Sequence, residues 1–322
     1  MEFRNIVKSG NTSYVVSLPR RWVLKNGLEK GSVVSIIENG DSSLTINPGV
    51  REGEKPARKH FINLDDMTPE TLRRQIVSCY INRISILTIS GKNIHQHLGM
   101  IKEALEELIA FEIMEVGNDR IVIRDCLDIK EMKADEIIRK MDLNIREMFS
   151  VVLEIMDGKQ KEISGYDSLK SMDRNLNRLN FLCEKIAREA LESPALANSL
   201  GLSPIQSVIV MNTSSTLENI GDNLKNLAGH LLQRVSGEEK IFIRKQFFLC
   251  FENYKKAMEA YFKVDKDSAN SVSDEKHLLR ERNSEFLEKN NKLSVPAVRI
   301  LERIQMIESM IGVLMRTIID IA

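Results

Sequence analysis

The first 47 residues alternate between apolar and polar positions as short β-strands do. Three runs rich in β-branched or aromatic residues predict strands, at residues 13–18, 33–37 and 44–46. Gly40-Asp41 predicts a hairpin turn between the last two. Pro19 and Gly27 predict the start and end of a short helix over residues 20–26, and residues 8–12 predict a mobile polar loop. Because so small a module buries little apolar surface, we expect a homodimer or a higher homo-oligomer.

The pattern changes twice after this module. Residues 49–60 contain Pro, Gly and mixed charges and predict a linker. Residues 61–129 predict a small α/β domain in the order β-α-β-α-β-β, with Thr68-Pro69 at the start of its first helix.

From residue 130 onward the period is helical. Interruptions at residues 158, 164–165, 193–204, 236–237, 264–265 and 290–291 delimit six helices. Two seams step by three and four residues throughout, which is typical of long helices packed at a shallow angle. The first is Leu169, Met172, Leu176, Leu179, Cys183, Ile186 and Ala190; the second is Ala297, Ile300, Ile304, Ile307, Ile311, Leu314, Ile318 and Ile321. We expect a multidomain, mainly α protein that ends in two three-helix bundles, at residues 130–236 and 237–322.

A short internal repeat supports the two triplets. Leu217-Glu218-x-Ile220 in the third helix recurs as Leu301-Glu302-x-Ile304 in the sixth, at the same place in each triplet.

Charge is distributed unevenly along a chain whose net charge is zero. Residues 1–30 carry six Lys or Arg against two acids. Arg4, Lys8, Arg20, Arg21 and Lys25 are therefore candidate DNA contacts, because guanidinium and ammonium groups bind phosphates and base edges. The alternative is a solvated basic face.

Two polar pairs, which together contain three carboxylates and one amide, are candidate metal ligands. Glu218 and Asp222 stand four residues apart on one helix, on the side opposite its apolar stripe, as a site on the outer bundle surface needs. Asp173 and Asn177 form a similar pair on the preceding helix, and the two pairs meet if those helices are neighbours. The alternative is a solvated face. Gly221 lies between the first pair and indicates close approach of another group.

Other classes of protein are disfavoured. The four cysteines are far apart, which argues against a disulfide framework or a zinc module and fits a reducing cytoplasm. No apolar run is long enough to cross a membrane, so we expect no membrane insertion. No spacing assembles a catalytic triad or a phosphate-binding glycine loop, so we expect no enzyme.

Residues 12–23, with Gly27-Leu28, Gly31, Val33-Val34 and residues 43–48, resemble the AbrB/MazE/SpoVT swapped-hairpin module. This resemblance covers residues 1–48 and implies an intertwined dimeric β-barrel that binds DNA. The arginines that bacterial relatives carry late in the short helix fall here at Val23 and Leu24, so Arg20 and Arg21 are assigned from local chemistry.

The helical region resembles the PhoU family. Its signature helix is matched by Leu217-Glu218-Asn219-Ile220-Gly221-Asp222, whereas the second repeat has Gln305-Met306 in place of Gly-Asp. The resemblance implies a divalent or iron-type metal on the outer face of the first bundle, held by Asp173, Asn177, Glu218 and Asp222. In the second repeat Asp274 is the remaining acidic remnant.

Together the modules resemble archaeal-type phosphate uptake regulators with an AbrB-like head. The resemblance implies a cytoplasmic, DNA-binding transcription regulator of phosphate-responsive genes. Two alternatives remain. One is a PhoU-like adaptor that contacts phosphate-transport or signalling proteins and uses the head only to dimerise; the other is an antitoxin.

Overall fold

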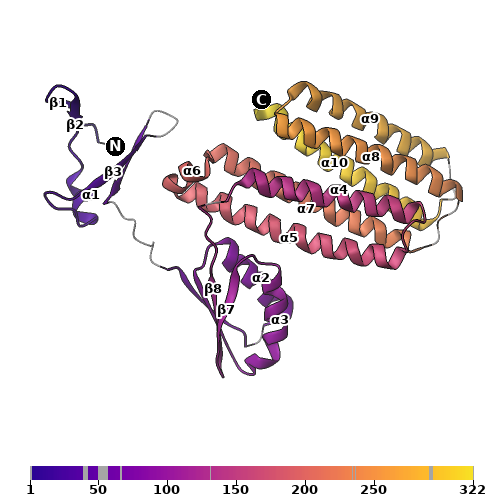
Figure 1. The fold of residues 1–322 in the computed structure, drawn as a ribbon, viewed down its shortest axis with the longest axis horizontal. Coiled ribbons are helices and arrows are strands. Elements are labelled where there is room, and N and C mark those ends of the chain that lie inside the picture. Colours follow the sequence, from indigo (N-terminus) through magenta and orange to yellow (C-terminus); the bar gives the residue numbers. More distant parts are fainter. Residues whose placement is uncertain are drawn as a thin grey trace. The chain divides into compact units, whose positions relative to one another are not determined.

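The computed structural model describes residues 2–38, 43–49, 57–65, 67–130, 132–233, 235, 237–289 and 293–321. The chain divides into two compact units, Met1–Ala57 and Arg58–Ala322. The described part is mostly helical, and its strands lie in the first 125 residues (Figure 1).

The first unit contains two antiparallel hairpins separated by a short helix. β1 (Val7–Ser9) pairs with β2 (Ser13–Val15), α1 (Arg20–Lys25) follows, and β3 (Val34–Glu38) pairs with β4 (Leu44–Pro48). The two hairpins form separate two-stranded sheets within one copy of the chain. The predicted turn Gly40-Asp41 and residues 50–56 of the predicted linker lie outside the described residues.

The short helix is confirmed, and the loop predicted at residues 8–12 is shorter, because only residues 10–12 form a turn. Pro19 precedes the first turn of α1, and Gly27 adopts φ +60° just past its end, a backbone conformation that glycine takes without steric cost. Lys8 and Ser9, however, belong to β1, where Lys8 is paired with Tyr14. Gly10 at φ +72° lets the chain reverse within a few residues, so this segment pairs as a hairpin.

The second unit begins with the predicted α/β arrangement. In chain order it comprises β5 (Lys59–Asn63), α2 (Pro69–Ile81), β6 (Ile86–Ser90), α3 (Ile94–Glu106), β7 (Phe111–Val116) and β8 (Arg120–Asp125). The sheet order is β5-β6-β8-β7, with β5 and β6 parallel and the other pairs antiparallel. Alternate strand residues such as Ile62, Leu87 and Ile121 are buried in one core with residues of α2 and α3. We call residues 58–125 the α/β subdomain.

The remaining helices form the bundle. They are α4 (Ala134–Met156), α5 (Glu162–Glu192), the short α6 (Pro194–Leu200), α7 (Pro204–Leu231), α8 (Gly237–Lys263), α9 (Lys266–Lys289) and α10 (Val295–Ile321). The six long helices correspond to the six predicted, and Figure 1 shows them side by side with their axes close to parallel. Both predicted seams lie largely inside: Leu176, Ile186, Ile300 and Ile311 are each 0% exposed.

The helices of each predicted triplet pack against one another, α4 with α5 and α7, and α8 with α9 and α10. The two triplets also share one continuous core, because α7 packs against α10 and α4 against α8. One expectation about the bundle is wrong. The break predicted at Ser164-Gly165 is absent, since α5 begins at Glu162 and runs through both residues. Gly165 is explained by packing: a Cβ there would collide with the Ile155 side chain at 2.7 Å.

No helix among the described residues is long and apolar enough to cross a membrane.

Candidate functional site

The basic side chains of the first unit extend from two of its elements. Arg20 and Arg21 are the first two residues of α1 and Lys25 is its last, and all three are exposed. Pro19 fixes where the helix begins, so it places the two arginines together on the first turn. Their guanidinium groups are accessible for contact with phosphates or base edges.

The two remaining predicted DNA contacts differ from these three. Lys8 is exposed on β1, opposite Tyr14 in the register. Arg4 forms an ion pair with Glu2 at 2.7 Å, in which both side chains stay exposed. Because Glu2 partly neutralises Arg4, we regard Arg4 as the weakest of the five predicted contacts.

Apolar side chains of the first unit are left uncovered in one copy. None of the residues 2–49 whose burial is described is buried. Val7, Tyr14, Val15, Ile36 and Leu44 are 51–66% exposed. Exposed apolar side chains on both hairpins are consistent with a module that associates with another chain.

The two predicted polar pairs meet between α5 and α7, with a lysine among them. Lys225 Nζ donates to Asp173 Oδ2 and to Asp222 Oδ1, at 2.6 Å in each case. Asp173 is buried at 6% exposure, whereas the Asp222 side chain is 43% exposed. Asn177, one turn further along α5, is half-buried and shares no hydrogen bond with this group among the described residues.

Glu218 lies beside the same group and is half-buried, so it is less accessible than a fully exposed surface residue. Burial, followed by the charges of Asp222 and Asp173, raises the pKa of Glu218 from 4.5 to about 7. The physical reason is Gly221, because a Cβ at this position would overlap Leu176 of α5. With glycine there, α5 lies directly against α7, so Glu218 is half-buried while the Asp222 side chain stays partly exposed.

This group does not fit a metal centre. A cation is already present, because the Lys225 ammonium contacts two of the three carboxylates. Within the described ranges, no three His, Cys, Asp or Glu side chains are arranged to hold a metal ion. The arrangement is that of an internal ion-pair cluster, so we assign it no metal chemistry.

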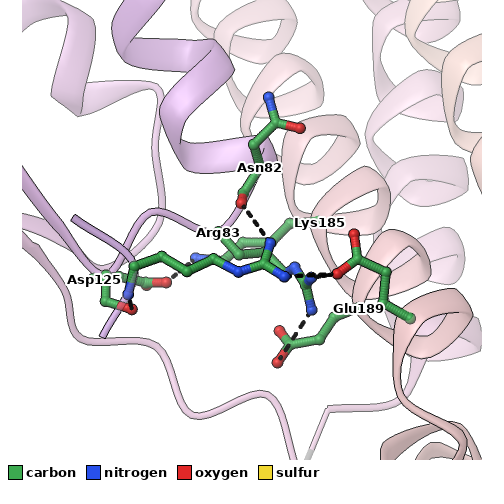
Figure 2. Close-up of polar contacts among 8 residues, drawn as sticks. Asn82, Arg83, Asp125, Lys185 and Glu189 are labelled. Carbon is green, nitrogen blue, oxygen red and sulfur yellow. Dashed lines mark hydrogen bonds and ion pairs between the residues drawn. The ribbon is translucent and has the colours of Figure 1, made fainter. Parts of the chain in front are cut away.

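A second polar cluster, which no pattern in the sequence indicates, joins α5 to the α/β subdomain (Figure 2). Lys185, whose side chain is 2% exposed, donates to Asp125 Oδ2 at 2.7 Å and lies 4.0 Å from the centre of the Tyr80 ring. Arg83, which precedes β6, pairs with Glu189 at 3.8 Å and with Glu192. Burial lowers the pKa of Lys185, and Asp125 opposes this effect. The cluster fixes the α/β subdomain to the end of α5.

The comparisons with known proteins concern the first unit. Residues 7–54 match the family model described as "Antidote-toxin recognition MazE, bacterial antitoxin". This range contains Lys8, Arg20, Arg21 and Lys25. The searches of curated proteins and of solved structures find no match to the chain. Residues 7–54 therefore resemble a DNA-binding domain of the MazE/AbrB type, which is consistent with a DNA-binding regulator.

Proposed function

We propose that this protein is a dimeric DNA-binding transcription regulator. The observation that carries the proposal is the MazE-type match over residues 7–54, together with the exposed cations on α1 within it. In this proposal Arg20, Arg21, Lys25 and Lys8 contact DNA, with Arg4 at the margin. A dimer presents each of these side chains twice, which suits an operator with two half-sites.

Replacing both arginines tests the proposed interface. Arg20→Ala with Arg21→Ala should weaken operator binding by about a hundredfold and reduce the dependence of log K on log salt by about 3–4, because a dimer then loses four phosphate contacts. Fluorescence anisotropy at several salt concentrations measures both quantities. Lys240→Ala with Lys245→Ala is the control, because these lysines are exposed on α8 in the other unit. Equal affinity of the arginine variant and the unmodified chain would contradict the proposal.

We further propose that the second unit couples DNA binding to phosphate supply. This part rests on the resemblance of the helical region to PhoU, carried by Leu217 to Asp222, and not on a metal site. In this proposal the chain has two states that differ in DNA affinity. A ligand or partner of the second unit shifts the chain toward the state that it binds more tightly, and so changes DNA affinity. Genome-wide DNA binding at high and low phosphate tests it: focused sites whose occupancy changes with phosphate are expected.

An antitoxin is the second candidate, because the matching model is described as a bacterial antitoxin. Affinity purification of the tagged chain distinguishes an antitoxin from a transcription regulator. An antitoxin returns a toxin in stoichiometric amount, whereas a regulator returns operator DNA alone. The PhoU-like adaptor predicts phosphate-transport or signalling proteins in the same eluate and no focused genomic sites.

A further inference from the structure

One stripe of side chains along α5 faces the α/β subdomain. Its members are spaced by four or three residues, which places them on one face of the helix. They are Arg174, Arg178, Phe181, Lys185, Arg188 and Glu192.

The second half of this stripe is docked. Phe181 packs against the core of the α/β subdomain, and Lys185 pairs with Asp125 at 2.7 Å. One turn further, Arg188 donates to Asn82 Oδ1 at 3.4 Å. Charged residues at this end of the stripe therefore have partners on the subdomain.

The first half of the stripe faces a cleft. Arg174 and Arg178 line a space of about 1000 Å³ between α5 on one side and α3 and β7 on the other. Both side chains are exposed, and neither forms an ion pair with another described residue. Arg178 nevertheless lies close enough to Tyr80 for its charge to act on the tyrosine hydroxyl. The cleft thus opens directly beside the docked junction.

The opposite wall carries carboxylates. Glu103 and Glu106 of α3 and Glu112 of β7 line the cleft and form no ion pair within the described part of the chain. Glu107, their neighbour, is paired with Arg73. Lys102 of α3 also lines this wall, so the wall carries both signs of charge with carboxylates in excess, whereas the α5 wall carries the two arginines. The volume of the cleft matches that of sites for small molecules.

We propose that this cleft binds a small phosphate ester that carries hydroxyl or amino groups at its other end, the chemistry shared by nucleotides and sugar phosphates. Guanidinium groups one helical turn apart suit the oxygens of a phosphate, which they bind in a bidentate fashion. Carboxylates repel a bare polyanion but accept hydrogen bonds from hydroxyl and amino groups. The two walls therefore select a ligand with two different ends.

Such a ligand bridges α5 and the α/β subdomain and holds the cleft at one width. As a binding site the cleft stands on its own geometry. Its role as the effector site rests on the proposed function, because only a regulator converts ligand binding into a change in DNA affinity.

Calorimetric titration of the full chain tests the proposal with four probes: AMP, ribose 5-phosphate, inorganic phosphate and adenosine. At least one of the two esters should bind, adenosine should not, and inorganic phosphate should bind about tenfold more weakly than the ester. Arg174→Gln with Arg178→Gln should weaken binding of the ester by at least about tenfold. Glu103→Gln with Glu106→Gln should weaken binding of the ester more than it weakens binding of inorganic phosphate. Arg316→Gln, at an exposed arginine of α10, is the matched control and should leave binding unchanged.

The proposal is overturned if neither ester binds, or if the arginine variant binds the ester as the unmodified chain does. Arg174→Lys with Arg178→Lys keeps the charge and removes the planar fork. Weaker ester binding by this lysine variant than by the unmodified chain supports bidentate contact, and this comparison does not need the glutamine variant to be stable. Operator binding by the same protein samples separates the two hypotheses. A chain that binds the ester but no DNA refutes the regulator alone, and a chain that binds DNA but neither ester refutes the cleft alone.

Discussion

At the scale of single residues, the α5–α7 interface shows how one glycine changes the chemistry of its neighbours. Gly221 has no side chain to hold Leu176 away, so α5 and α7 pack directly together, with Asp173 buried and Glu218 half-buried between them. Desolvation disfavours their charged forms, and Lys225 offsets part of this for Asp173. Glu218 has no such hydrogen bond from Lys225, so its pKa rises to about 7.

The Glu218 carboxyl should make stability depend on pH. Its pKa rises from 4.5 to about 7 on folding, so the native state favours the protonated form. The stabilisation is complete below pH 4.5 and is lost as pH rises through about 7. Glu218→Gln removes this loss. At alkaline pH the free energy of unfolding of the variant should therefore exceed that of the unmodified chain by about 1–2 kcal/mol, a value discounted for partial exposure.

Urea unfolding near pH 5 and near pH 8 measures the effect. The control is Glu302→Gln, at the equivalent position of the internal repeat, where the glutamate is exposed on α10. A gain for Glu218→Gln of the same size at both pH values would show that titration is not its cause.

At the scale of elements, the Lys185–Asp125 ion pair is the contact with the most buried charge at the junction between α5 and the α/β subdomain. Asp125 is the last residue of β8, and Lys185 lies over the Tyr80 ring of α2. Asp125→Ala leaves the buried Lys185 ammonium without its hydrogen-bonded carboxylate, which should cost about 3–5 kcal/mol. Hydrogen exchange should therefore speed up in β8 and near the C-terminal end of α5, while α10 is unaffected.

A double substitution distinguishes the charge from simple loss of packing. Lys185→Met retains an apolar chain over the Tyr80 ring, so Asp125→Ala combined with Lys185→Met should recover most of the stability lost in Asp125→Ala. If the double variant is as unstable as the sum of the single variants, the pair is not coupled. Lys240→Ala, at an exposed lysine of α8, is the reference substitution.

Periodicity and end signals in the sequence predicted most elements, because those signals are local. Thr68 Oγ1 accepts from Thr71 N at 3.2 Å, and Ser203 forms a capping box with Gln206, so both helix starts are marked in the sequence. Strand β1 was missed because its pairing with β2 depends on a turn at Gly10. Lys185 and Lys225 were missed because their partners, Asp125 and Asp173, are 60 and 52 residues away. Spacing along one helix carries no information about such partners.

At the scale of the whole molecule, the two units differ in what one copy can bury. Unit Arg58–Ala322 contains both continuous apolar cores, whereas unit Met1–Ala57 exposes the apolar side chains of both hairpins. Burial of apolar surface is the main favourable term in folding, so under the proposed function we expect the first unit to gain stability from dimerisation. The second unit should keep its fold whether or not the chain dimerises.

Charges on the hairpins should therefore separate the copies without unfolding the second unit. Val15→Asp with Ile36→Asp adds four acidic groups to a dimer at positions that are 51% and 60% exposed in one copy. The dissociation constant of the dimer, measured by sedimentation equilibrium, should rise by at least a hundredfold, which corresponds to about 2.7 kcal/mol. Operator binding should fall in parallel, while the thermal unfolding of the helical unit is unchanged.

Lys30→Asp alters charge at an exposed polar site of the same unit and should leave the dimer intact. A monomeric unmodified chain at micromolar concentration, or an unchanged dimer in the hairpin variant, would mean that these apolar surfaces do not join two copies.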